Sequence, residues 1–314
     1  MIKSFKVTNY VGDSITLELT RPDKTGFIVK SVDGLGPVKA TVNMTQIATN
    51  DGARFNSARL DKRNIVFDLE FMELPVRKDE NGDVLPYETI EDIRHKSYKF
   101  FPLKKKIKLV VETDKRIVET EGYVESNEPD IFSNKEGCRI SILCPDSFFY
   151  SLGSTETVFS GLKPMLEFPF GNESTTEPLI EMSRIETKQE HYVYYEGDVE
   201  VGVTILVHAV GEASNLNIYN ATTEEHMRID TEKLAQITGS GIIPGDTIII
   251  ETRKGCKKIR LLREGKEINI LNCLDKGTKW FTLVKGDNVF VYTTDEGGSN
   301  LQFSVTNKVV YEGV

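Results

Sequence analysis

The stretch from Val38 to Phe71 constrains the fold of this chain more than any other, because two strand patterns flank about twenty residues that suit neither a core nor a structureless loop. Hydrophobic and polar residues alternate from Val38 to Thr45 and again from Ile65 to Phe71. A period of two predicts a half-buried strand in each flank. Between the flanks, Asn50-Asp51-Gly52 is a strong signal for a hairpin turn.

The middle of this stretch predicts an arm. If the two flanks pair with each other across the turn, the ribbon from Thr45 to Asn64 must project beyond the sheet. Its large apolar residues are Ile47, Phe55 and Leu60, which are too few to hold the ribbon in a core. A long polar hairpin of this kind is suited to gripping a neighbouring copy of the chain, since exposed strand edges favour a partner.

The composition indicates a globular protein with an acidic balance. A length of 314 residues predicts two domains of ordinary size, and a content of 39% hydrophobic and 28% charged residues is typical of a globular protein. The net charge of -9 argues against a general affinity for nucleic acids or anionic membranes. Neither a signal segment nor a membrane-spanning run is found, so we expect a soluble chain that folds in the cytosol.

The order of the patterns predicts a mainly β protein with domains at 1–151 and 152–314. The first domain has strands, the arm, one helix from Tyr87 to Phe101 and a second hairpin, which is an α+β sheet with a single helix. Close to Ser151 the composition changes. From Val158 onward about ten short strands, separated by turns and without a convincing helix, predict an antiparallel sandwich or jelly roll.

Patterns that carry chemistry are missing from the sequence. The four histidines are dispersed along the chain. The four cysteines have no metal-binding spacing, so we interpret the cysteines as small buried hydrophobic residues. Nucleophile elbows and nucleotide-binding glycine loops are not found. We therefore predict no enzyme activity, no cofactor and no metal. A catalytic pair of carboxylates, as in a glycosidase, is defined by its separation in space and not by its spacing in the sequence, so counting residues does not exclude one. The Lys104–Lys108 cluster is typical of a solvated strand start.

The order of elements resembles the distal tail proteins of long-tailed phages that infect Gram-positive hosts. In the first half the resemblance rests on the hairpin GPVKATVNMTQIATNDGARFNSARLDKRNIVFDLEF, the helix ETIEDIRHKSYKFF and the closing segment CPDSFFYS. The second half, which ends with WFTLVKGDNVFVY, is similar to the galectin-like sandwich that these proteins carry. The resemblance covers essentially the whole chain and is more specific in the first half.

This resemblance implies a structural protein of the phage tail tip. The first, tail-tube-like domains are expected to form a homohexameric ring that joins the tail tube protein to the tail fibre or baseplate protein and leaves a channel for DNA. The outer galectin-like domains can serve as a docking point for a receptor-binding protein. The expected location is the virion, after assembly in the host cytoplasm. An acidic chain predicts an electronegative or neutral channel that passes DNA without binding it.

Within this picture the arm lies in the interface between subunits. The predicted contacts are Thr45, Ile47, Asp51, Arg54, Phe55, Arg59, Asp61 and Arg63. One alternative is another ring-forming component, such as a tail tube subunit or a protein of a phage-like bacteriocin. A second, from a different class, is a carbohydrate-binding module or glycoside-active protein in which Trp280 of the sandwich stacks on a sugar.

Overall fold

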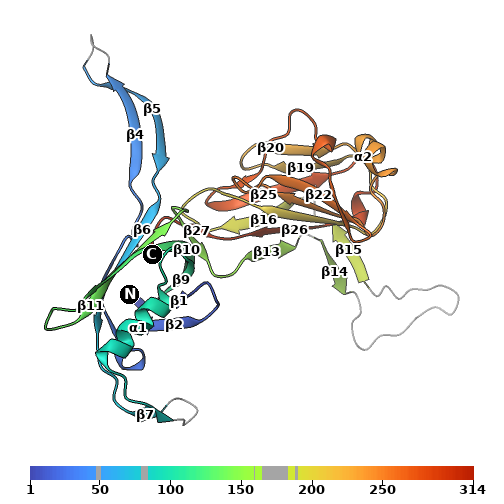
Figure 1. Ribbon diagram of the computed structural model, residues 1–314. Helices are drawn as coiled ribbons and strands as arrows, with labels where there is room; N and C mark the ends of the chain where they lie inside the picture. Colours follow the sequence, from blue (N-terminus) through green and yellow to red (C-terminus); the bar gives the residue numbers. More distant parts are fainter. Residues whose placement is uncertain (47–50, 79–83, 159, 165–182, 188–189) are drawn as a thin grey trace. The chain divides into compact units, whose positions relative to one another are not determined.

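The computed structural model describes residues 1–46, 51–78, 84–158, 160–164, 183–187 and 190–314 (Figure 1). The fold is mainly β and its strands pair in antiparallel sheets, which confirms the predicted class. Two compact units are formed, the first by Met1–Leu152 together with Val310–Val314 and the second by Gly153–Val309. Neither α-helix in the described part of the chain has the length and apolar character that crossing a membrane requires.

The first unit is built on one antiparallel sheet with the strand order β2-β1-β9-β10-β11-β6-β3. Its main strands are β1 (Ile2–Thr8), β2 (Ser14–Glu18), β3 (Phe27–Asp33), β6 (Arg63–Phe71), β9 (Lys106–Thr113), β10 (Ile117–Asp130) and β11 (Gly137–Cys144). Short additions are β7 (Arg77–Lys78), β8 (Val84–Leu85), β12 (Phe149–Ser151) and β27 (Val310–Tyr311). Alternate side chains of the main strands point into a core that one helix covers.

That helix is α1 (Ile90–Phe100), close to the predicted position. Thr89 caps its first turn: its hydroxyl accepts a hydrogen bond from the amide of Asp92, whose carboxylate accepts one from the Thr89 amide in return. The buried residues of this helix are Ile93 and Ser97, whereas Tyr98 is 41% exposed. The helix therefore packs on the sheet with a narrow face.

Aromatic side chains fill the space between α1 and the sheet. The ring of Phe67 in β6 lies 5.2 Å from that of Phe5 in an edge-to-face arrangement and 6.0 Å from that of Phe101. All three side chains are fully buried or nearly so. Such pairs add specificity to the burial of apolar area, so β6 is the strand around which this core is packed.

The chain returns to the first unit at its last described strand. β27 pairs with β12, with Phe149 opposite Tyr311, and β12 pairs in turn with β10. The guanidinium of Arg116 lies 4.4 Å from the centre of the Tyr311 ring. Nothing in the local sequence pattern indicated that residues after 309 belong with the first unit, because strand pairing across 160 residues leaves no local signal.

The second unit contains a six-stranded sheet in the order β13-β26-β18-β21-β22-β23 and a four-stranded sheet in the order β16-β25-β19-β20. The six strands are β13 (Thr155–Val158), β18 (Thr204–Ala209), β21 (Thr247–Glu251), β22 (Lys258–Arg263), β23 (Lys266–Asn269) and β26 (Leu301–Asn307). The four are β16 (Glu190–Tyr195), β19 (Leu216–Asn220), β20 (Glu225–Ile229) and β25 (Gly286–Thr293). Smaller pairs join β14 (Ser160–Pro164) to β15 (Ser183–Thr187) and β17 (Val201–Gly202) to β24 (Thr282–Leu283).

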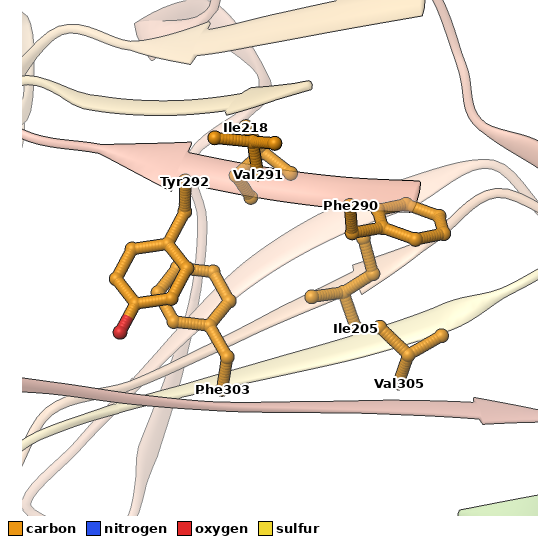
Figure 2. A pocket seen from close by; sticks show the side chains of 7 residues that line it. All are labelled: Ile205, Ile218, Phe290, Val291, Tyr292, Phe303 and Val305. Carbon is orange, nitrogen blue, oxygen red and sulfur yellow. The ribbon is translucent and has the colours of Figure 1, made fainter. Parts of the chain in front are cut away.

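The two larger sheets face each other across an apolar core. Figure 2 shows Phe290 and Tyr292 of β25 directed toward Ile205 of β18 and toward Phe303 and Val305 of β26. The rings of Tyr292 and Phe303 stack with their centres 3.9 Å apart. The side chains leave no room for a water molecule, so this space is packed core and not a ligand site.

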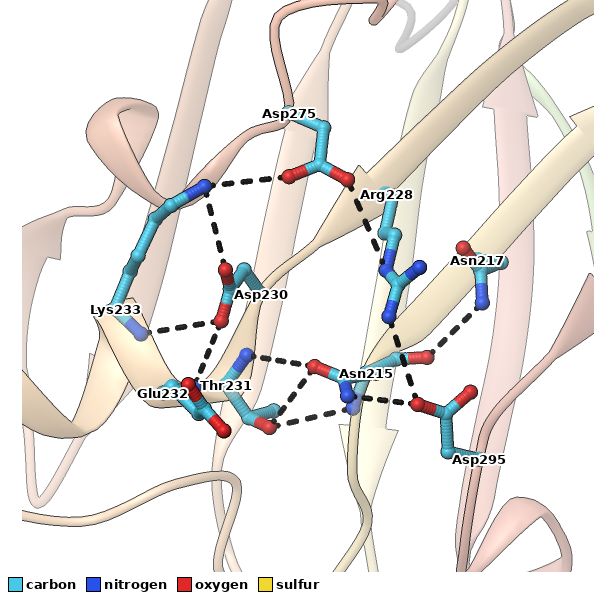
Figure 3. Close-up of polar contacts among 9 residues, drawn as sticks. All are labelled: Asn215, Asn217, Arg228, Asp230, Thr231, Glu232, Lys233, Asp275 and Asp295. Carbon is cyan, nitrogen blue, oxygen red and sulfur yellow. Dashed lines mark hydrogen bonds and ion pairs between the residues drawn. The ribbon is translucent and has the colours of Figure 1, made fainter.

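A short helix, α2 (Thr231–Thr238), corrects the expectation that the second half has no helix. Asp230 caps it by accepting hydrogen bonds from the amides of Glu232 and Lys233, and Gly239 ends it in the left-handed conformation. Figure 3 shows a polar network around this cap. The cap and stop signals were present in the sequence, but eight residues are too few for a helical period to stand out.

Candidate oligomer interface

The arm exists, but it is built differently from the prediction. β4 (Ala40–Gln46) pairs with β5 (Ala53–Leu60) in a two-stranded sheet of its own, and Figure 1 shows this ribbon extending away from β6. The two flanks therefore do not pair with each other, although such pairing was one way in which the sequence could form an arm. Both edges of β6 are already occupied, one by β3 and the other by β11, so the first flank belongs to the arm.

One face of the arm is apolar. In the register, Ala40 lies opposite Leu60, Val42 opposite Ala58 and Met44 opposite Phe55, and opposite residues of an antiparallel pair share a face. A one-residue irregularity between Asn43 and Met44 shifts the register. Without this β-bulge, strict alternation would place Phe55 on the opposite face from Ala58 and Leu60. The bulge thus gathers the large apolar residues on one side.

The apolar face is open to solvent. The exposed fractions are 46% for Val42, 60% for Met44, 60% for Phe55 and 42% for Leu60. The sequence pattern of Val42 and Met44 predicted burial in a core, and the structure shows that nothing among the described residues covers them to that extent. A two-stranded ribbon on its own is at best marginally stable in water, so an arm with an uncovered apolar face is suited to a partner.

The opposite face is polar and satisfies many of its own hydrogen-bonding groups. The Thr41 hydroxyl donates to the Asp61 carboxylate at 2.9 Å, and the Asn43 amide donates to the Ser57 hydroxyl at 3.1 Å. Asn56, at the bulge, donates to the Thr45 hydroxyl at 2.6 Å. Because these groups are bonded within the arm, the apolar face is the better candidate for a protein contact.

The predicted contact residues are distributed over both faces of the arm and its base. Thr45, Arg54 and Arg59 lie on the polar face, Phe55 lies on the apolar face, and Asp51 lies exposed at the turn. Asp61 sits at the base, and Ile47 falls outside the described residues. Val42 and Met44 were not among the predicted contact residues. An alternating sequence pattern indicates that a strand has an apolar face, but it does not indicate which surface covers that face.

Arg63 does not fit the expectation that it contacts a neighbouring subunit. Its side chain is fully buried, and burial lowers the pKa of its guanidinium below the usual value. The guanidinium lies 4.2 Å from the centre of the Phe149 ring. Its guanidinium donates hydrogen bonds to backbone carbonyls of this same chain, so its donors are directed inward.

Those carbonyls belong to three separate segments of the first unit. Nη1 donates to Gly34 and Gly36 at 2.5 and 2.7 Å, just before the arm. Nη2 donates to Ser147 at 2.8 Å and to Glu312 at 2.6 Å. The amide of Val314 also donates to the Leu35 carbonyl at 3.0 Å. Arg63 therefore fastens the base of the arm to the loop after β11 and to the last residues of the chain.

Two lysines of the Lys104–Lys108 cluster lie on β9 and are paired with carboxylates of the neighbouring strand β10. Lys106 pairs with Glu121 and Lys108 pairs with Glu119, each at 2.7 Å. Alternating charge of this kind provides no continuous positive surface for phosphates, which agrees with the interpretation of Lys104–Lys108 as the solvated start of a strand.

The remaining candidate sites are groups of metal-ligating side chains, the cysteines and Trp280. Within the described ranges, no group of three or more His, Cys, Asp and Glu side chains is placed to hold a metal ion. Cys138, Cys144 and Cys273 are buried as expected, and burial raises the pKa of Cys138 to about 12. Cys256, by contrast, is exposed. Trp280 is half-buried, with the Lys257 ammonium 5.6 Å from its ring centre, and its role in binding stays a prediction.

Comparisons with known proteins find similarity in structure and not in sequence. No protein-family model matches the chain, and no curated protein matches it. Chains from two structures of the phage p2 baseplate in its activated conformation, one with strontium and one with calcium, have a TM-score of 0.43 and 11% identity. They cover 98% of this chain and 98% and 99% of their own.

The Dit protein of phage SPP1 is more similar in structure. Its crystal structure has a TM-score of 0.60 and 12% sequence identity to this chain. The similarity covers 98% of this chain and 99% of the SPP1 protein, so it includes both units. This chain therefore has the fold of the SPP1 Dit protein along nearly its whole length.

Proposed function

We propose that this chain is a distal tail protein of a bacteriophage, with a structural and not a catalytic role at the tail tip of the virion. The observation that carries the proposal is the fold, which follows the SPP1 Dit protein over 98% of this chain. That protein is described as a paradigm of the hub of the adsorption apparatus in phages that infect Gram-positive hosts. The arm supplies independent support, because it presents an apolar face that suits a neighbouring copy.

In this proposal six first units form a closed ring. Each arm places its apolar face, formed by Val42, Met44, Phe55 and Leu60, on the next subunit around the ring. A ring of identical head-to-tail contacts leaves no arm unpaired. Fully burying a side chain of this size stabilises by about 1.5–3 kcal/mol, and since each is roughly half exposed, docking would contribute on the order of 1 kcal/mol per side chain.

The ring joins the tail tube protein on one side to a fibre or baseplate protein on the other. Its channel passes DNA without binding it, in keeping with the net charge of -9 per chain and with the paired lysines of β9. The second units provide a docking surface for a receptor-binding protein. Assembly takes place in the host cytoplasm, before the virion is complete.

Electron microscopy of the purified protein in negative stain, together with light scattering, tests the proposal. The expected result is a six-fold ring with a central channel and a mass six times the 35.4 kDa of the chain. A chain that stays monomeric at every concentration, alone and with its tail tube partner, would contradict the ring. Rings of a different symmetry would contradict the hexamer while leaving a tail-tip role open to direct localisation on virions.

A further inference from the structure

The turn between β21 and β22 carries the densest group of positive charges in the second unit. The six residues Arg253–Lys258 contain four cations and no carboxylate, in a chain whose net charge is -9. All four of these basic side chains are exposed. Like charges held this close together repel one another, and a bound anion would relieve that repulsion.

The position of this turn is fixed by buried hydrogen bonds. Thr252 is 3% exposed, and its hydroxyl donates to the Phe281 carbonyl at 2.7 Å and accepts from the Val203 amide at 2.7 Å. These bonds hold the turn beside the segment that contains Lys279 and Trp280. The Lys257 ammonium accordingly lies 5.6 Å from the centre of the Trp280 ring. The fold therefore brings the basic side chains of the turn close to the segment that contains Lys279.

Several other cations in the described part of the second unit are already paired with carboxylates. Arg263 and Asp246 are joined at 2.6 Å, and Arg260 contacts both Glu251 and Glu267. In the part of the chain that the structure describes, no ion pair within 4.0 Å involves Arg253, Lys254, Lys257 or Lys279. Lys258 reaches Glu251 only at 4.0 Å. The positive charge of the turn is thus available to a ligand.

We propose that this surface, called the basic tip, binds a polymer rich in phosphate groups. The basic tip consists of Arg253, Lys254, Lys257, Lys258 and Lys279 around Trp280. The cations are grouped by a turn in which the Cys256 amide donates to the Arg253 carbonyl at 3.0 Å, so several of them are presented close together. A chain of linked phosphates carries closely spaced charges, about one every 3.4 Å along a nucleic-acid strand, and can therefore contact more than one of these cations at a time.

Phosphate polymers fit the basic tip better than acidic proteins do. Exposed ion pairs between lysine and a carboxylate contribute only about 0–1 kcal/mol each. A polymer of high linear charge density gains more, because each contact releases condensed counterions into solution. The inference concerns the second unit alone and does not depend on ring formation.

Titration of fluorescent inorganic polyphosphate with the full-length protein, followed by anisotropy at several salt concentrations, tests the proposal. We expect binding at low salt that weakens as salt rises. The double variant Lys254→Gln/Lys257→Gln should weaken binding at least fivefold and make the salt dependence shallower by about one to two units of slope. The control Lys115→Gln/Lys266→Gln removes two exposed lysines outside the tip and should change neither quantity. Equal effects of the two double variants would overturn the site.

Cys256 provides a second readout inside the basic tip, because it is the one exposed cysteine among the four. Polyphosphate should slow its alkylation by iodoacetamide, and an unchanged rate would contradict binding at this turn. Polyglutamate of the same charge is the competing probe. If it binds as tightly as polyphosphate, the preference for phosphate is wrong and the surface is one for acidic proteins.

Discussion

At the scale of single residues, Arg63 shows how a charged side chain can act as a packing element. In the sequence it lies within the polar ribbon from Thr45 to Asn64, which placed it among the predicted charged contacts of the arm. In the fold it is the first residue of β6, and that register directs its side chain into the protein. A buried guanidinium without a carboxylate is tolerated when carbonyl oxygens satisfy its donors.

Replacing Arg63 should therefore destabilise the first unit strongly. Arg63→Met removes the donors while leaving the carbonyls of Gly34, Ser147 and Glu312 without their partner. The expected loss is about 3 kcal/mol or more in the free energy of unfolding, measured by urea denaturation. The control is Arg59→Met on the exposed polar face of the arm, which should change stability by less than about 0.5 kcal/mol. Similar losses in both variants would show that Arg63 is not an anchor.

Asp230 makes a prediction about acid stability. Hydrogen bonds from the Lys233 amide, followed by those from the Lys233 side chain and the Glu232 amide, hold the pKa of Asp230 below its usual 3.8. A carboxylate with a lowered pKa stabilises the fold above its unfolded pKa, and this contribution is lost as pH falls through the folded value. Asp230→Ala should therefore cost about 1 kcal/mol at neutral pH.

The cost of Asp230→Ala should shrink as pH falls below about 3.8. Thermal unfolding of both proteins between neutral and acidic pH measures the difference. A cost that grows toward low pH would have the wrong sign and would exclude the cap as the source. Glu264→Ala, at an exposed turn, is the control for the general effect of removing a carboxylate.

At the scale of elements, the arm shows how one bulge determines what a hairpin can bind. Strict alternation along β5 would place Phe55 on the same side as Ser57 and Arg59. The register shift beside Asn43 instead places Phe55 opposite Met44. The arm consequently has an apolar face and a polar face, and the predicted contact residues on the polar face become less suitable for a dry interface.

Changing the apolar face should prevent assembly without unfolding the chain. Met44→Ser/Phe55→Ser removes two side chains that are each 60% exposed, so the unfolding temperature of the monomer should change little. Light scattering should show monomers where the unaltered chain forms rings. The matched control, Asn43→Ala/Ser57→Ala, alters a facing pair on the polar side and should still assemble. Assembly of the Met44/Phe55 variant would remove this face from the interface.

At the scale of the whole molecule, each unit has its own hydrophobic core. Phe67 is packed within the first unit and Phe303 within the second, and both are buried. The last residues of the chain complete the first unit, so the second unit is inserted between β12 and β27. Separate cores favour separate cooperative unfolding of the two units.

Calorimetry should resolve two unfolding transitions. Phe67→Ala should lower the temperature of one transition and Phe303→Ala that of the other, with a loss of about 3–5 kcal/mol in each case because each leaves a cavity. The two variants serve as controls for each other. A shift of both transitions in either variant would show that the two units unfold as one.

The sequence by itself determined the mainly β class, the place of the helix near residues 90–100 and the existence of the arm. Each of these depends on local information: a period of two, a period of 3.6, a capping residue or a turn signal. The break in composition near Ser151 is local in the same way, and the division into domains predicted from it stays a prediction.

Only the tertiary structure decided which strand the first flank pairs with, which face of the arm is apolar and where Arg63 points. β6 could not accept β4 because β3 and β11 already occupy its edges. The return of Val310–Val314 to the first unit was equally hidden. All of these depend on contacts between segments far apart in the chain, and an alternating pattern records only that a face is apolar, not which surface covers it.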